Sequence, residues 1–187
     1  LNGIWAAWNE WRPKGIVNEY QFNGSWYNVR DFSGTSLEWG NEAFGYIQFT
    51  NYYDIAGGLN INYPGLSNSM LRGGPALKTP GVINSWFSVE SDSRKKLSLE
   101  YEMNFSHGFE HSRRSISYGL DITYKPNNRL SLSLYPQYVK ATGHQQYVRT
   151  VTGDSPAYIL SSIDQNIASM SVRVNYGITP AMSLPWY

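Results

Sequence analysis

Residues 96–106 read KLSLEYEMNFS, and polar and apolar side chains alternate at every position of this stretch. Successive side chains of an extended strand point to opposite faces of a sheet, whereas a helix repeats its apolar positions every three or four residues. The alternation therefore predicts a β-strand with one apolar face and one polar face. The apolar side chains are those of Leu97, Leu99, Tyr101, Met103 and Phe105.

The same two-residue period recurs along most of the chain, and no segment has a helical period. It is clearest at residues 55–63, 115–124, 130–134 and 168–176. Stretches rich in Gly, Pro, Asn and Asp separate these segments, as is typical of turns between strands. The sequence therefore predicts an all-β fold.

Short turns and longer loops alternate in chain order. RPKG at 12–15 and SDS at 91–93 are short, and TNYY at 50–53 is counted with them. The last long connection joins QQYVRTV at 145–151 to AYILSSI at 157–163. We expect these two segments to pair and to form a hairpin that projects from the outer surface. The longer, Gly-, Ser- and Pro-rich connections lie near residues 31–40, 64–80, 107–112 and 152–156.

This alternation is typical of bacterial outer-membrane barrels, which have short periplasmic turns and longer external loops. Aromatic side chains at the short turns predict a girdle at the membrane interface on that side. The sequence therefore predicts an antiparallel up-and-down transmembrane β-barrel that forms a single domain over residues 1–187. The girdle residues are Trp11, Tyr52, Tyr53, Tyr124 and Tyr176.

A soluble β-sandwich also alternates apolar and polar residues and also has tight turns, so it remains the alternative fold. Three features favour the barrel. The polar faces carry Ser, Asn and Gly with few Lys, the apolar faces are rich in Tyr, and the connections alternate in length.

Composition restricts the possible partners and chemistry. The 187 residues include 15 Lys and Arg against 14 Asp and Glu, a net charge of +1, so we expect no nucleic-acid partner. The absence of cysteine excludes disulfides, thiolate zinc sites and cysteine nucleophiles. The chain begins at Leu1 without Met, and we expect a partial chain that holds an incomplete barrel of roughly ten strands.

Three motifs give the chain a resemblance to a known family: LRGGP at 71–75, DSRKK at 92–96 and VNYGITP at 174–180. Over roughly residues 43–184 the sequence resembles the C-terminal barrel region of a Bacteroidota outer-membrane family, the domain of unknown function 5916 family. The resemblance implies a transmembrane barrel and no enzymatic activity. Family members typically place a sandwich domain of the carbohydrate-binding-family-nine or DOMON type before the barrel, and that domain is absent from this chain.

HGFEH at 107–111 contains the H-x-x-E-H pattern of some zinc peptidases. That pattern binds zinc only on a helix, where His107 and His111 would project from one side. Because the segment follows a strand and contains Gly108, we expect the end of a hairpin and no metal site. His144 lies in another predicted outer loop, so adventitious metal binding stays open.

Charged residues on the polar faces predict a network inside the lumen. Glu100, Glu102 and Asp121 would face Arg173 there, and pairs of opposite charge usually hold such a barrel closed. We expect Arg72, in the Gly-rich loop LRGGPALKTPG, to pair with Glu100 or Glu102 and to fold that loop over or into the lumen. We expect no catalytic residues and no cofactor, although Glu100 and Glu102 have about the 7 Å spacing of a glycosidase pair.

Tryptophans are the remaining candidates for binding. Trp5, Trp8 and Trp11 recur every third residue, which on a strand scatters them over both faces, so we expect a lipid-interface or packing role. Trp39 falls in a predicted outer loop, where it is the one candidate for stacking on a ligand.

The sequence as a whole predicts a non-catalytic integral protein of the cell outer membrane that acts as a scaffold, a narrow conduit or a subunit of a surface assembly. Its partners would be the lipid bilayer and other outer-membrane proteins. The alternative is a secreted, soluble all-β carbohydrate-binding module, and an outer-membrane hydrolase that uses loop residues is a third hypothesis with little support.

Overall fold

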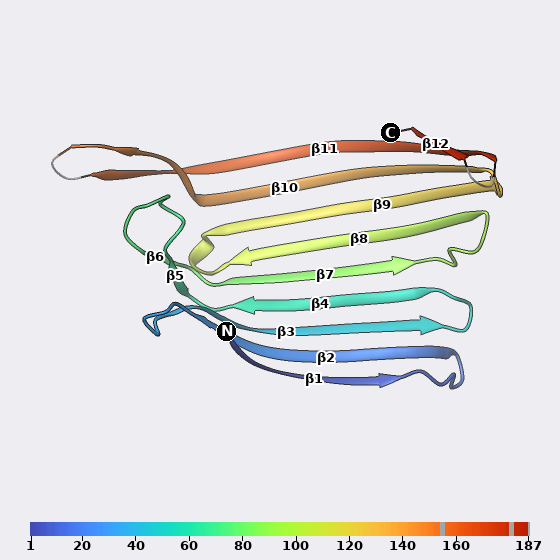
Figure 1. Cartoon of the computed structure of the whole chain (residues 1–187), viewed down its shortest axis with the longest axis horizontal. Coiled ribbons are helices and arrows are strands. Elements are labelled where there is room, and N and C mark those ends of the chain that lie inside the picture. Colours follow the sequence, from blue (N-terminus) through green and yellow to red (C-terminus); the bar gives the residue numbers. More distant parts are fainter. Residues whose placement is uncertain (154–155, 180–181, 187) are drawn as a thin grey trace.

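Ten strands form one antiparallel sheet (Figure 1). Their order in the sheet is their order in the chain, so each strand pairs with the sheet strand that precedes it in sequence. The structure is a computed structural model that describes residues 1–153, 156–179 and 182–186. The strands are β1 (Asn2–Glu10), β2 (Val17–Arg30), β3 (Ser36–Phe49), β4 (Asp54–Asn62), β7 (Val82–Glu90), β8 (Leu97–Gly108), β9 (Arg113–Asn127), β10 (Leu130–Val151), β11 (Ala157–Thr179) and β12 (Met182–Trp186).

The prediction of an all-β, up-and-down antiparallel architecture is confirmed. The sheet is not closed into a barrel, however, because β1 and β12 are its two edges and do not pair with each other in the described part of the chain. A separate two-stranded hairpin, β5 (Gly65–Ser67) with β6 (Leu77–Thr79), lies within the connection from β4 to β7. No helix among the described residues is long and apolar enough to cross a membrane.

The pairing register aligns the apolar positions of each strand with the apolar positions of its neighbours. Tyr101 of β8 pairs with Val89 of β7 and with Leu120 of β9, so apolar side chains meet on one face. Its neighbour Glu102 pairs with Ser88 and with Gly119 on the other face. If one strand slipped by one residue relative to its neighbour, its apolar side chains would move to the polar face. The observed register therefore keeps the apolar side chains of all the strands on one face and the polar ones on the other.

The sheet is a single layer with almost no buried core. In the described residues, Leu71 in the loop between β5 and β6 is the one buried apolar side chain, at 5% exposure. The accessible surface is 12938 Å² for a 21.3 kDa chain, against about 9,000 Å² for a compact monomer of that mass. No second sheet of the described chain covers either face, so the architecture differs from that of a β-sandwich.

The short and long connections gather at opposite ends of the sheet, as the sequence predicts (Figure 1). At the short end, residues 91–96 join β7 to β8, and β9 is separated from β10 by only Asn128 and Arg129. At the other end, β10 and β11 continue beyond their neighbours as the predicted extended hairpin, where Val151 pairs with Ala157. The expected connection at 152–156 includes residues 154–155, which lie outside the described residues.

One side-chain cluster ties two neighbouring short turns together. Asp92 accepts hydrogen bonds from Arg94 Nε at 2.8 Å and from Arg94 Nη2 at 2.9 Å. The guanidinium carbon of Arg94 lies 3.3 Å from the ring centroid of Tyr52, which belongs to the turn between β3 and β4. The hydrogen bond from Arg94 lowers the pKa of Asp92 to about 2.

We expect the contacts of Arg94 with Asp92 and Tyr52, which connect these two turns, to persist at acidic pH. The pKa of Asp92 is lower in the folded chain than its ordinary value, so the carboxylate contributes stability above that ordinary value, and the contribution disappears as the pH falls towards about 2. Denaturant unfolding of wild type and Asp92→Asn should give midpoints that differ at pH 7 and converge near pH 2. A difference that is the same at both pH values would show that the charge of Asp92 has no role in this tie.

Candidate functional site

The polar face carries hydrogen-bonded side chains that reach from one strand to the next. Asn60 Nδ2 on β4 donates to Glu42 Oε1 on β3 at 2.9 Å, and Ser25 Oγ on β2 donates to Glu42 Oε2 at 3.3 Å. Tyr27 of β2 donates its hydroxyl to Asn62 of β4 across the intervening strand. Side-chain hydrogen bonds therefore supplement the backbone ladder on this face.

Four of the five residues predicted to form a polar network surround one hollow on the polar face. The hollow has a volume of about 330 Å³ and is lined by residues of β8, β9, β10 and β11. Tyr135 donates its hydroxyl to Glu102 Oε2 at 3.2 Å, while Thr123 Oγ1 donates to Asp121 Oδ1 at 3.0 Å. The lining residues are Glu100, Glu102, Asp121, Ser133, Tyr135, Ser171 and Arg173.

A row of carboxylates extends from this hollow across four strands. Asp54 of β4 pairs with Glu90 of β7, Glu90 pairs with Glu100 of β8, and Glu100 pairs with Asp121 of β9. We call Asp54, Glu90, Glu100 and Asp121 the acidic row. Like charges that lie opposite each other on neighbouring strands repel, so the row favours cations or protons on this part of the face.

Asp54 and Glu90 are members of this row that the alternation along single strands does not predict. Asp54 is the first residue of β4 and Glu90 is the last residue of β7, so both border short turns. Counting positions outward from the short turns would have placed Asp54 beside Glu90, but not Glu100 or Asp121, which are the fourth residue of β8 and the seventh from the end of β9. The alternation of single strands does not contain that information, because it depends on register.

The predicted pairing of Arg72 with Glu100 or Glu102 is wrong. The Arg72 guanidinium lies over the ring of Tyr147, 5.5 Å from the ring centroid, at the opposite end of the sheet from the short turns. A Cβ atom added to Gly74 would collide with the ring of Tyr158, so the loop backbone packs directly onto the extended hairpin. The loop therefore folds against the hairpin of β10 and β11, and not onto the carboxylates.

Trp39 lies in β3, and not in the predicted outer loop. Its ring stacks on that of Tyr63 with a centroid distance of 3.9 Å and an angle of 13° between the planes. Trp39 pairs with Asn28, eight positions along from the apolar pair formed by Ile47 and Tyr20, and because eight is an even number Trp39 lies on the same apolar face. Because Tyr63 covers one side of the indole, that side is closed to a sugar.

The tryptophans near the N-terminus lie on both faces, as expected from their spacing. Trp5 pairs with Ser25 on the polar face, whereas Trp8 pairs with Phe22 on the apolar face. Trp8 also makes an edge contact with Tyr20 at a centroid distance of 5.5 Å. They do not form a single stacking platform.

The HGFEH segment forms the end of the hairpin between β8 and β9. His107 is within β8 and pairs with Arg114, while residues 109–111 form one 3₁₀ turn. Glu110 and His111 have φ angles of 55° and 58°, so no regular helix continues through them. Among the described residues, no group of three or more His, Asp or Glu side chains is arranged to hold a metal ion.

We expect Tyr147 to hold the Gly-rich loop against the hairpin. Replacing Tyr147 with Leu keeps apolar bulk but removes the ring below Arg72, an exposed contact of about 0.5–1 kcal/mol. Trypsin cleavage after Arg72 in the native protein should therefore accelerate about two- to fivefold, as measured by mass spectrometry.

The matched control is Tyr138→Leu, which alters another tyrosine of β10 whose hydroxyl donates to Asn166. Cleavage after Arg72 should be unchanged in that variant. Equal cleavage rates in wild type and Tyr147→Leu would show that the contact does not order the loop.

Comparison with known proteins identifies a family but no characterised relative. No curated protein and no solved structure matches the chain. A family described as a domain of unknown function (DUF5916) matches residues 2–186, which is more of the chain than the stretch from 43 to 184 that carries the sequence resemblance. The match covers all ten strands of the main sheet, and the chain therefore belongs to the DUF5916 family.

Proposed function

We propose that this chain is an integral outer-membrane β-barrel protein without catalytic activity, and that its sheet is part of the barrel wall. In this role it serves as a scaffold, a narrow conduit or a subunit of a surface assembly. Its apolar face contacts the hydrocarbon of the bilayer, and its polar face lines the lumen. The edges β1 and β12 pair with further strands or with another outer-membrane protein.

The exposed apolar face is the observation that carries this proposal. Phe87 of β7, Tyr101 of β8 and Met170 of β11 are 42%, 37% and 65% exposed, although each belongs to the apolar set of its strand. Soluble monomers rarely expose a continuous apolar patch of more than a few hundred Å². A bilayer covers such a surface without a second protein layer, because it supplies hydrocarbon along the whole strand.

Strand length and aromatic placement also fit a bilayer. The strands from β2 to β9 in the main sheet contain 9 to 15 residues, and a tilted strand needs about 9–11 to cross the hydrocarbon. Tyr20 and Tyr124 lie near the short turns, and Trp39 lies at the end that bears the long loops. Aromatic rings at both ends of an apolar band are typical of outer-membrane barrels.

The polar face favours a narrow lumen over a wide pore. Tyr135 and Trp86 place large rings on this face, and Tyr27 spans from β2 to β4 through its hydroxyl. A barrel whose inner wall carries such side chains has less free cross-section than one lined by small residues.

We expect the protein to remain in the outer-membrane fraction and to require detergent for extraction. Unheated samples should migrate faster on gels than heated ones, because a closed barrel resists unfolding in dodecyl sulfate. Recovery in the soluble fraction without detergent would contradict the proposal and favour a soluble module.

A matched pair of variants tests which face meets the lipid. Leu120 of β9 is on the apolar face and Ser117 of the same strand is on the polar face. Leu120→Arg should reduce the heat-modifiable fraction strongly, since an arginine near the bilayer midplane costs about 2–4 kcal/mol, whereas Ser117→Arg should be tolerated. The reverse order would place the lipid on the polar face.

A further inference from the structure

A pocket on the polar face lies at the end of the sheet that bears the long loops. Its volume is about 400 Å³. The connection from β5 to β7, the start of β9, the middle of β10 and one residue of β11 line it. We call it the loop-end pocket.

One row of paired residues forms the base of this pocket. Arg113 of β9 pairs with Gly143 of β10, and Gly143 pairs with Ile163 of β11. Paired residues on neighbouring strands project to the same face, so a guanidinium group and an apolar side chain lie on one face with the glycine between them. The nearest atom of another strand to a Cβ added at Gly143 is Ile163 Cγ2, at 3.8 Å, so the row has open space at its centre.

A bulge in β10 forms the rim of the pocket. The pairing of β10 with β11 skips from Gly143 to Gln146, which leaves His144 in the bulge. His144 N donates to Ser112 O at 2.9 Å, and His144 Nδ1 lies 3.0 Å from Ser162 Oγ. These contacts fix the bulge against the end of the β8–β9 hairpin, and bulges commonly re-aim side chains beside binding sites.

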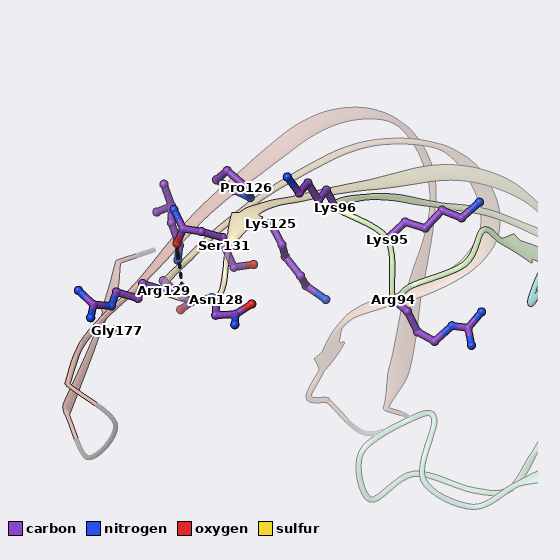
Figure 2. A pocket seen from close by; sticks show the side chains of 12 residues that line it. Arg94, Lys95, Lys96, Lys125, Pro126, Asn128, Arg129, Ser131 and Gly177 are labelled. Atoms are coloured by element: carbon purple, nitrogen blue, oxygen red, sulfur yellow. Dashed lines mark hydrogen bonds between the residues drawn. The ribbon is translucent and has the colours of Figure 1, made fainter.

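The charge of the pocket favours a ligand with one negative charge. Among the described residues that line it, Arg113 is the one with a permanent charge, and none is Asp or Glu. No ion pair of Arg113 occurs in the described structure. By contrast, five basic side chains line the pocket between the short turns, where Glu90 and Asp92 already balance part of their charge (Figure 2). One guanidinium matches one carboxylate, to which it can donate two parallel hydrogen bonds.

The rest of the lining supplies an apolar wall and neutral polar groups. Met70, Pro80 and Ile163 contribute apolar surface beside Arg113. Ser112 Oγ is buried and has no hydrogen-bond partner among the described residues, so a polar group of a ligand would stabilise it. No Phe, Tyr or Trp of the described chain lines the pocket, so it offers a sugar no ring to stack on. A ligand that fits these groups has a carboxylate joined to an apolar body.

We propose that the loop-end pocket binds a small monocarboxylate with an apolar body. The carboxylate accepts hydrogen bonds from Arg113, and the body lies above Gly143 against Ile163. A volume of about 400 Å³ and an apolar wall with a few polar groups are typical of small-ligand sites. This inference goes beyond the proposed function and does not depend on it. With the polar face lining the lumen, as proposed above, the pocket lies at the outer mouth of that lumen.

The test is a ligand-observed NMR titration of the purified chain in maltoside micelles with N-acetyl-L-leucine, which joins one carboxylate to an isobutyl group. Its neutral counterpart N-acetyl-L-leucinamide has the same apolar body. The amide should bind about tenfold more weakly, because it cannot form the charge-assisted pair with the guanidinium. Equal affinities of the two compounds would overturn the assignment of a carboxylate site.

A pair of arginine variants tests the charged group. Arg113→Gln should weaken the binding of N-acetyl-L-leucine about tenfold and remove its advantage over the amide. The matched control is Arg114→Gln, because Arg114 is the next residue of β9, projects to the other face and does not line the pocket. Its affinity should stay within about twofold of wild type. Equal weakening in both variants would show a response to net charge alone and would overturn the pocket assignment.

A pair of glycine variants tests the open space and leaves the charge unchanged. Gly143→Val fills the centre of the row and should weaken binding at least about tenfold, although Arg113 is retained. The control is Gly24→Val on β2, where an added Cβ also meets no closer atom than one at 3.5 Å, and its affinity should equal that of wild type. Unchanged binding by Gly143→Val would show that the ligand lies elsewhere, which contradicts the proposal.

A longer ligand distinguishes a small molecule from a protein segment. Acetyl-tetraalanyl-leucine ends in the same group but exceeds the pocket, so it should bind more weakly than N-acetyl-L-leucine. Tighter binding would show that the pocket receives the end of a peptide and would overturn the small-ligand assignment. The same titrations work in plain buffer, so a chain that needs no detergent would refute the proposed function without affecting this test.

Discussion

Backbone hydrogen bonds between neighbouring strands hold this structure together, because packing inside a core contributes almost nothing. Leu71 is the one buried apolar side chain of the described chain, and it belongs to a loop. Backbone hydrogen bonds to the neighbouring strands hold each strand of the main sheet in place. The pairing register decides which side chains share a face. The apolar face and the acidic row are both consequences of that register.

The alternation of single strands predicts the strands and their two faces well. Leu97 to Phe105 alternate on β8 as the sequence requires, and the partners of β8 extend the pattern to β7 and β9. The same reasoning brings Glu100, Glu102, Asp121 and Arg173 to one hollow, because all four belong to the polar sets of neighbouring strands. The alternation of short and long connections correctly predicts which ends of the strands meet.

Contacts between loops are not contained in strand periodicity. Arg72 stacks over Tyr147 because β10 and β11 extend beyond the sheet, and nothing in the sequence near Arg72 specifies that partner. The Gly- and Ser-rich connection near residues 31–40 predicts a loop at Trp39, yet β3 already begins at Ser36 and includes Trp39. Two turns about 30 residues apart in sequence line one pocket with Arg94, Lys95, Lys96, Lys125 and Arg129, and composition alone does not reveal that proximity.

The most direct test of this account is a spin-label scan along β8 in lipid vesicles. The chain has no cysteine, so single cysteines can be introduced from Ser98 to Phe105 without removing others. Labels at the odd-numbered positions should collide mainly with oxygen dissolved in the bilayer, and labels at the even-numbered positions mainly with a water-soluble nickel chelate. Odd-numbered positions shielded from both reagents, as in a protein core, or equally open to the chelate would contradict the claim that the apolar face meets hydrocarbon.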